Sequence, residues 1–133
     1  MSSKNSDCKI PVSIGEVFDK YSILEIKLSK IKNQQKKDLV SKEVELLKPY
    51  IEEYSLDKEI YNNLKNINTK LWEIEDALRI KEYDKEFDEK FIQLARSVYF
   101  TNDERAEVKR HINMIFKSEI VEVKDYVDYK NKN

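Results

Sequence analysis

Glycine, proline and cysteine are nearly absent from this sequence. Its 133 residues include one Gly, two Pro and one Cys. Sheet proteins with many tight turns need more Gly and Pro than this, so the composition argues against a β-rich fold. Because Cys8 stands alone, it has no partner for an internal disulfide, which favours a reducing compartment and a cytoplasmic location.

An excess of one charge and a long apolar run are also missing. The 25 basic and 26 acidic residues leave a net charge of -1, which argues against bulk binding to nucleic acid or to a membrane surface. The opening residues, MSSKNSDCKI, lack the apolar core of a signal peptide. No apolar run approaches the roughly 20 residues that span a bilayer, so we expect no membrane segment.

Apolar and charged residues are both abundant, and their spacing is helical. Hydrophobic residues make up 40% and charged residues 38% of the chain, which suits amphipathic helices around one core. A capping box formed by Ser13 and Glu16 marks the start of the first helix, which we expect to end near Lys32. Apolar residues three and four apart predict further helices over residues 39–54, 57–83, 85–100 and 101–117. A second capping box, T-N-D-E from Thr101 to Glu104, marks the start of the last of these helices. Pro49 predicts a kink in the second helix, or its division into two short helices.

The sequence therefore predicts an all-α fold, a single-domain bundle of about five amphipathic helices with an irregular C-terminal segment. We expect a flexible N-terminal tail over residues 1–10, a single helical domain over residues 11–129 and a frayed C-terminus over residues 130–133. After residue 117 the apolar residues have mixed spacing, which predicts an extended stretch or a short helix lying across the bundle.

Five polar residues fall inside or beside the apolar stripes when each helix is projected at about 100° per residue. They are Glu25, Asn68, Glu75, Arg79 and Arg105. Buried charges are costly unless they are paired, so we expect these side chains to pair with one another or to line a cleft. Structural ion pairing and a ligand site both fit this pattern.

Arginine is scarce and confined to one part of the chain. The four Arg among the 25 basic residues all lie between positions 79 and 110. The planar guanidinium binds carboxylates and phosphates in a way that Lys does not. We therefore predict a set of ligand-binding residues, namely Arg79, Arg105, Arg110, Asn68 and Arg96. Glu25 and Glu75 would orient these residues or act as catalytic acid and base.

Two carboxylate pairs have the spacing that lets neighbouring residues of a helix share a metal ion. Glu16 and Asp19 form one pair, and Glu73 and Asp76 form the other. Carboxylates at this spacing suit Mg²⁺, which predicts a metal-dependent phosphate-ester or pyrophosphate hydrolase. The alternative is a pair of solvated helix faces, because a chain with 26 acids contains such spacings by chance.

Gly15, the single glycine, lies in the first turn of the first helix. Its missing side chain would let an anion approach the helix N–H groups, or would let another part of the protein pack closely. Of these two interpretations we favour close packing.

Several stretches together resemble an uncharacterised family of small helical proteins. They are PVSIGEVFDKYSILEIKLSKI, LWEIEDALRIKE, FDEKFIQLARSVYFTNDERAEVKRHIN and KSEIVEVKDYVDY. The resemblance spans residues 11–129 and is weakest over residues 33–56. It implies a shared helical fold in proteins of bacteria and of large viruses or phages, some encoded near surface-polysaccharide genes. It implies no activity, and so assigns no role to the residues it singles out, which are Asp19, Glu25, Glu75, Asp76, Arg79, Arg96, Asn102, Asp103, Arg105 and Arg110.

Three functions compete on this basis, and whether the protein is an enzyme stays open. The first is binding of, or action on, a phosphorylated or anionic small molecule through the Arg/Glu cluster. A sugar nucleotide is one example, with the glycan context implied by the resemblance alone. The second is a non-enzymatic interaction module that docks onto a partner enzyme or forms a homodimer through extra apolar residues such as Ile23 and Ile26. The third is the metal-dependent hydrolase, with Mg²⁺ as its cofactor.

Overall fold

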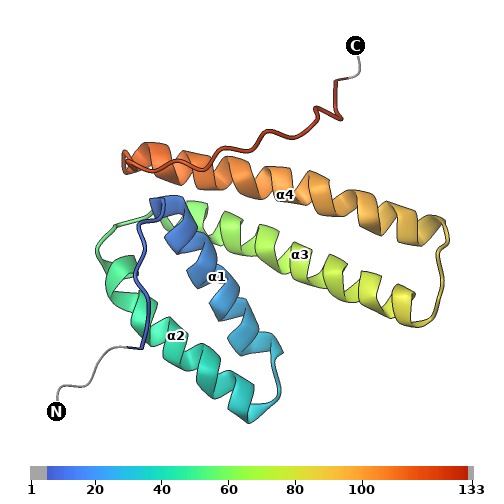
Figure 1. Cartoon of the computed structure of the whole chain (residues 1–133), viewed down its shortest axis with the longest axis horizontal. Coiled ribbons are helices and arrows are strands. Elements are labelled where there is room, and N and C mark those ends of the chain that lie inside the picture. The colour runs from blue at the N-terminus through green and yellow to red at the C-terminus, as the bar shows by residue number, and fades with distance from the viewer. Residues whose placement is uncertain (1–5, 132–133) are drawn as a thin grey trace.

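Four α-helices dominate the part of the chain that the computed structural model describes, residues 6–131 (Figure 1). They are α1 (Ile14–Lys30), α2 (Gln34–Glu52), α3 (Lys58–Tyr83) and α4 (Glu89–Ile115). Helices α1 and α2 form one antiparallel hairpin, and α3 and α4 form a longer one. Helix α1 contacts each of the other three, so it holds the two hairpins together. The fold class is all-α, as the sequence predicts, and no strand occurs among residues 6–131.

Each helix begins after a residue whose side chain accepts a hydrogen bond from an N–H of the first turn. These caps are Ser13, Asn33, Asp57 and Asp88. Such caps satisfy N–H groups that have no partner within the helix. The predicted starts at Ser13 and Asp57 are confirmed. Only half of the predicted capping box forms, because the Glu16 carboxylate accepts from Lys109 instead of turning back to the first turn.

The predicted number of helices is wrong, because residues 101–115 continue the helix that begins at Glu89. Thr101, expected to cap a fifth helix, lies in the middle of α4 and is buried. The inward positions repeat every four and three residues without interruption, through Leu94, Val98, Thr101, Arg105 and Val108. No Gly or Pro interrupts this region. One continuous stripe makes one helix, so the capping pattern at Thr101 marks no boundary.

Helix α2 is longer than predicted at its start and continuous at Pro49. It begins at Gln34, because Asn33 caps it and Gln34 donates to Asp38 one turn later at 2.8 Å. Pro49 lies in its last turn, where the ring removes one backbone hydrogen bond and the helix stays in one piece. The prediction of two short helices is therefore wrong. No residue of α2 is buried, so this helix contributes little to the core.

The apolar core lies where α1 crosses the first half of α3 and the second half of α4. Phe18, Leu64 and Ile112 are its buried centre. Aromatic rings extend the core: Phe116 stacks on Phe18 with ring centres 6.2 Å apart, and Tyr54 meets Phe116 edge-on at 5.2 Å. Removing these rings from water and placing them in edge and stacked contacts stabilises the crossing.

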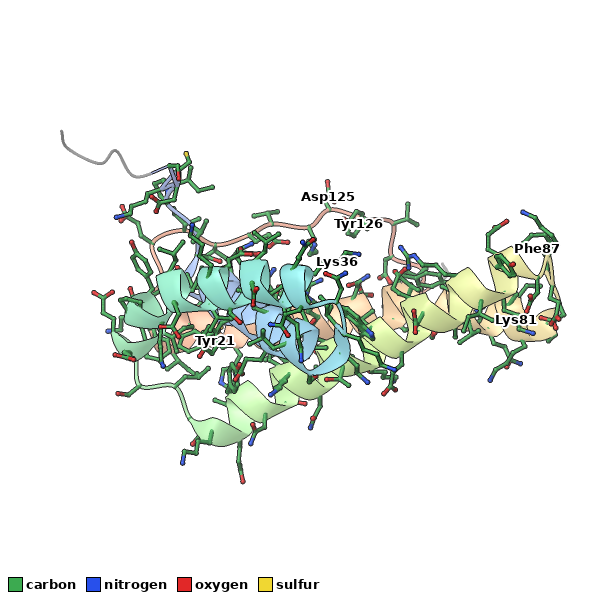
Figure 2. The ribbon with its side chains drawn as sticks, turned by 90° about the horizontal axis from the view of Figure 1, so that it is seen from below. Tyr21, Lys36, Lys81, Phe87, Asp125 and Tyr126 are labelled. Atoms are coloured by element: carbon green, nitrogen blue, oxygen red, sulfur yellow. The ribbon has the colours of Figure 1, made fainter. Side chains whose placement is uncertain are left out.

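The other end of the long hairpin lies far from this core. Lys81 and Phe87 mark it, and no part of α1 or α2 reaches them (Figure 2). At this tip Lys81 bonds both Glu86 and Asp88 at 3.0 Å, which closes the turn between the two helices. These bonds raise the pKa of Lys81 and lower the pKa of Asp88. Exposed ion pairs thus hold the turn, where Phe87 also meets Phe91 edge-on with ring centres 5.3 Å apart.

The C-terminal segment, residues 118–131, has no regular secondary structure and runs back along α4 (Figure 1). Glu122 joins it to Lys109 of α4 at 3.0 Å, and Tyr129 joins it to Asp103 of α4. Tyr126 lies between these two attachments and is exposed (Figure 2). The predicted irregular segment is confirmed, and of its two predicted forms the extended one is observed.

The predicted tails are only partly described. Residues 6–10 are exposed and have no regular secondary structure, and residues 1–5 of the predicted N-terminal tail lie outside the described residues. At the other end, the N–H groups of Lys130 and Asn131 donate to Asp128. Residues 132–133 of the predicted frayed end also lie outside the described part. None of the described helices is long and apolar enough to cross a membrane.

Candidate functional site

A buried carboxylate, Asp19, is the centre of a polar cluster where α1 faces α3 and α4. Arg105 of α4 donates to both carboxylate oxygens, from Nε at 2.9 Å and from Nη2. Asn68 of α3 donates to Oδ1 of Asp19 at 2.9 Å and to the Ser22 hydroxyl at 2.8 Å. The two forked, charge-assisted bonds fix the guanidinium in position. The hydrogen bond to Asp19 raises the pKa of Arg105, so the arginine stays charged.

Lys109 is the second buried cation of this cluster. Its Nζ donates to Glu16 at 2.7 Å and to Glu122 at 3.0 Å, and it lies 3.9 Å from Asp19. Burial acts to lower the pKa of Lys109, but the bonds to Glu16 and Glu122 outweigh burial and raise it. Bonds from Lys124 and Lys109 lower the pKa of Glu122 to about 2. One ionic network therefore joins α1, α4 and the C-terminal segment.

The approach of α1 to α4 depends on Gly15. Its N–H donates to the side-chain oxygen of Asn113 at 2.6 Å, and a Cβ at this position would lie 2.5 Å from the carbonyl oxygen of Lys109. This contact is what the close-packing interpretation expects. The other interpretation of Gly15, an anion bound at the start of α1, is wrong, because the N–H groups of Ile14 and Gly15 are already bonded to Ser118 and Asn113.

Beside the Asp19 cluster, an open cleft of about 490 Å³ lies between α1, α3 and α4. Its apolar lining comes from Ile23, Ile26, Leu71 and Trp72. Its polar lining comes from Asn68, Glu75, Asp76, Arg79, Asn102 and Arg105. A volume of this size, with an apolar wall and a few polar groups, is typical of small-molecule sites. Asn68 and Arg105 belong to both the cleft and the cluster, so the buried carboxylate orients part of the cleft wall.

The cleft brings together four of the residues that the sequence singles out: Asn68, Glu75, Arg79 and Arg105. Arg79 Nη1 lies 2.6 Å from Glu75 Oε2, but 72% of the Arg79 side chain and 46% of the Glu75 side chain are exposed. The two residues therefore form a solvated i,i+4 pair rather than a buried pair that sets the fit between helices.

Three other predicted site residues lie elsewhere. Glu25 accepts from the Tyr61 hydroxyl and lies 3.7 Å from Lys65 Nζ, outside the cleft. Burial and this hydrogen bond raise the pKa of Tyr61. Arg110 is exposed and lines a separate small hollow beside the C-terminal segment. Arg96 is exposed on α4 and does not line the cleft.

The four predicted metal ligands have different surroundings. Glu16 and Asp19 are both bonded to cations of α4. Glu73 is exposed on α3, and Asp76 lines the cleft. Within the described part of the chain, no three His, Cys, Asp or Glu side chains come together as a metal-binding group. The magnesium site stays a prediction, and the cations beside Glu16 and Asp19 give it no support.

Sequence reasoning missed four further buried polar residues, which are Ser22, Thr101, Lys109 and Asn113. A second stripe on α1 could have indicated this polar region from the sequence. Its positions, spaced four, three and four apart, are all buried, and they are Gly15, Asp19, Ser22 and Ile26. Two of these residues are small, as close approach of another helix requires. Helix α1 is therefore buried on two faces, and the prediction considered only one.

Together, the fold and the cluster define a small all-α protein whose helices meet around a buried aspartate, beside an open cleft. Residues 8–131 match the model of DUF6165, a family of unknown function, and the chain belongs to that family. No curated protein and no solved structure matches the chain. The match confirms the resemblance to an uncharacterised family. The occurrence in bacteria and viruses and the link to surface-polysaccharide genes stay expectations.

Proposed function

We propose that this protein binds a small anionic molecule in the cleft between α1, α3 and α4. The observation that carries the proposal is Arg105, which lines the cleft while Asp19 holds its Nε and Nη2. Arg105 Nη1 makes no hydrogen bond among residues 6–131, so it is available to a ligand. A donor that is held in place before binding loses little conformational freedom on binding, which favours affinity.

Arg79 supplies a second guanidinium, at the solvent-exposed part of the cleft. Its contact with Glu75 is exposed, so replacing that contact with an anionic group of a ligand costs little free energy. Glu75 also remains a candidate acid or base, because it lines the cleft, whereas Glu25 is bonded to Tyr61 outside it.

Thermal-shift and calorimetric titrations test this proposal, with inorganic phosphate, sugar acids, sugar phosphates, nucleotides and sugar nucleotides, each with and without Mg²⁺. We expect at least one of these anions to raise the melting temperature, because a ligand that binds only the folded state stabilises it. Arg79→Met should weaken that binding roughly tenfold. Arg96→Met, which removes an exposed arginine outside the cleft, should not. No shift with any anion, or equal losses in the two variants, contradicts the proposal.

A second candidate function is docking onto a partner enzyme or onto a second copy of the chain. The residues that suggested it, Ile23 and Ile26, line the cleft, and Ile26 is buried, so they form no exposed patch. Exposed apolar side chains lie instead in two regions. They are Ile80, Tyr83, Phe87 and Ile92 toward the tip of the long hairpin, and Val123, Tyr126 and Val127 in the C-terminal segment. Exposed apolar patches often mark interaction surfaces. Light scattering tests the homodimer, and a monomer at every concentration argues against it.

A further inference from the structure

The charges around the cleft largely cancel within the protein. Arg79 is paired with Glu75, and Arg105 is paired with Asp19. Asp76 is the remaining charged residue of the lining and makes no ion pair among residues 6–131. The lining itself carries two carboxylates and two guanidinium groups, and the third carboxylate, Asp19, is shared between Arg105 and Lys109, whose Nζ lies 3.9 Å away. The lining therefore has no excess positive charge to match a ligand with several negative charges, whereas a ligand with one negative group, placed against Arg105, adds only one unmatched charge.

Three polar groups of the lining have no hydrogen-bond partner within the described part of the chain. They are the Asp76 carboxylate, the Asn102 amide and the Trp72 indole N–H. Asp76 and Trp72 belong to α3 and Asn102 belongs to α4, so they approach a ligand from two walls. A carboxylate accepts, an indole N–H donates and an amide does both. A ligand with several hydroxyl groups satisfies all three, because each hydroxyl both donates and accepts.

The apolar part of the lining suits a ring. Trp72 stands beside Ile23, Ile26 and Leu71, and the C–H face of a sugar ring packs on such an aromatic surface while its rim hydroxyls stay polar. The positions that α3 contributes, from Asn68 to Arg79, extend for roughly 16 Å along the helix. The cleft is therefore longer than one sugar ring and accommodates a substituted sugar or a disaccharide.

We propose that the ligand of this cleft is a sugar acid, a hydroxylated ring that carries one carboxylate. The ring packs on Trp72, its hydroxyl groups bond Asp76 and Asn102, and its carboxylate bonds Arg105. A terminal phosphate carries about -1.5 to -2 charges at neutral pH, and a lining without excess positive charge disfavours it relative to a single carboxylate. This inference rests on the proposed anion site and narrows the class of its ligand.

Trp72 is the single tryptophan of the chain, so its fluorescence and its indole N–H signal in NMR spectra report on this cleft alone. Glucuronic acid, glucose, glucose 6-phosphate and uridine diphosphate are each titrated into the full chain. We expect saturable changes in both signals with glucuronic acid. The other three compounds should bind at least tenfold more weakly, because glucose lacks the anionic group and the two phosphorylated compounds carry more than one negative charge.

Substitutions at two acids of α3 test the role of the hydroxyl groups. Asp76→Ala should weaken glucuronic acid binding roughly tenfold, because hydrogen bonds from the ligand hydroxyls to a charged acceptor contribute more than the solvent-screened repulsion between Asp76 and the ligand carboxylate. Glu73→Ala is the matched control, since Glu73 is exposed on the same helix and does not line the cleft. Circular dichroism of both variants shows that they are folded. Unchanged binding in Asp76→Ala would overturn the proposed contact and the sugar-acid ligand with it.

The outcomes for the inference and for the anion site are distinct. Glucose binding as tightly as glucuronic acid would overturn the need for the carboxylate. Uridine diphosphate binding more tightly than glucuronic acid would overturn the sugar-acid ligand and leave the anion site standing. No response of Trp72 to glucuronic acid would overturn the inference on its own, and the broader anion screen tests the site separately.

Discussion

The two ends of the α3–α4 hairpin are built from the same two helices, yet they differ in burial throughout. At the crossing, where α1 packs against both helices, Asp19, Leu64, Thr101 and Ile112 are all buried. In the distal hairpin, residues 75–100, no residue is buried, and Tyr83 is 87% exposed. The presence of α1 at the crossing accounts for the difference. In the distal hairpin α3 and α4 bury only the faces that they turn toward each other, and their other faces are exposed to solvent.

An acidic side chain pairs with an arginine at both ends, but the two pairs differ in burial and therefore in their contribution to stability. At the crossing, 1% of the Asp19 side chain and 27% of the Arg105 side chain are exposed. In the distal hairpin, the exposed fractions of Glu75 and Arg79 are 46% and 72%. Breaking a buried pair leaves an uncompensated charge, whereas an exposed pair contributes about 0–1 kcal/mol. The same pair chemistry therefore supports the fold at the crossing and leaves Arg79 free to exchange partners in the distal hairpin.

Among these substitutions, Asp19→Asn at the crossing should lower the free energy of unfolding most. The change removes the carboxylate charge that faces Arg105 and Lys109 while it keeps the size of the side chain. We expect the free energy of unfolding to fall by about 3 kcal/mol, the lower end of the range for a broken buried pair, since Arg105 is partly exposed. Urea denaturation followed by circular dichroism measures the loss.

Glu75→Gln is the matched control, because it removes the charge of the exposed pair from the same hairpin. We expect the free energy of unfolding to change by less than about 0.5 kcal/mol. Losses of similar size in Asp19→Asn and Glu75→Gln would show that the crossing and the distal hairpin are energetically alike, and the comparison would be wrong.

Gly15→Ala should have the next largest effect on the free energy of unfolding, and whether it stabilises or destabilises the protein tests the close packing of α1 on α4. In an open helix this change stabilises by about 1 kcal/mol, because Ala forms helices better than Gly. At Gly15 the new Cβ would lie 2.5 Å from the backbone oxygen of Lys109, so α1 and α4 must move apart. We expect a loss of about 2 kcal/mol, typical of overpacking. Thermal and urea denaturation measure it.

The control for this change is Gln93→Ala, at an exposed position of α4 in the distal hairpin. It should alter the free energy of unfolding by less than about 0.5 kcal/mol. Stabilisation by Gly15→Ala would mean that the two helices have room to spare at the crossing, and the close-packing interpretation would be lost.

Local patterns in the sequence were sufficient for the helical fold and for the starts of α1 and α3. They failed at Thr101, because a capping pattern of four residues does not show that the inward stripe continues through it. They also missed the first turn of α2, where residues 34–38 are all polar and carry no apolar periodicity. Both errors arise because one local pattern was used without a second one: the inward stripe of α4 continues through Thr101, and Asn33 caps a polar first turn of α2.

Patterns within single helices predicted only part of the candidate site. Projection of α3 identified Asn68, Glu75 and Arg79, because these polar residues stand beside an apolar stripe of their own helix. The spacing of Glu16 and Asp19 assigned Asp19 to a metal site, and no pattern gave a role to Lys109. The partners of these two residues come from α4 and from the C-terminal segment, and no periodicity within one helix records a pairing over such a sequence separation.

The smallest expected effect is that of Arg79→Met on stability. Because the Arg79 side chain is 72% exposed, its removal leaves Glu75 in contact with water rather than buried without a partner. We expect the free energy of unfolding to change by less than about 0.5 kcal/mol in chemical denaturation. The double change Glu75→Leu with Arg79→Met should recover nothing, since the single change loses nothing. A loss of about 3 kcal/mol in the single variant, restored in the double, would show a structural pair of the kind found at the crossing. Arg79 would then be a scaffold residue, and weaker anion binding in Arg79→Met would reflect a damaged fold rather than a lost ligand contact.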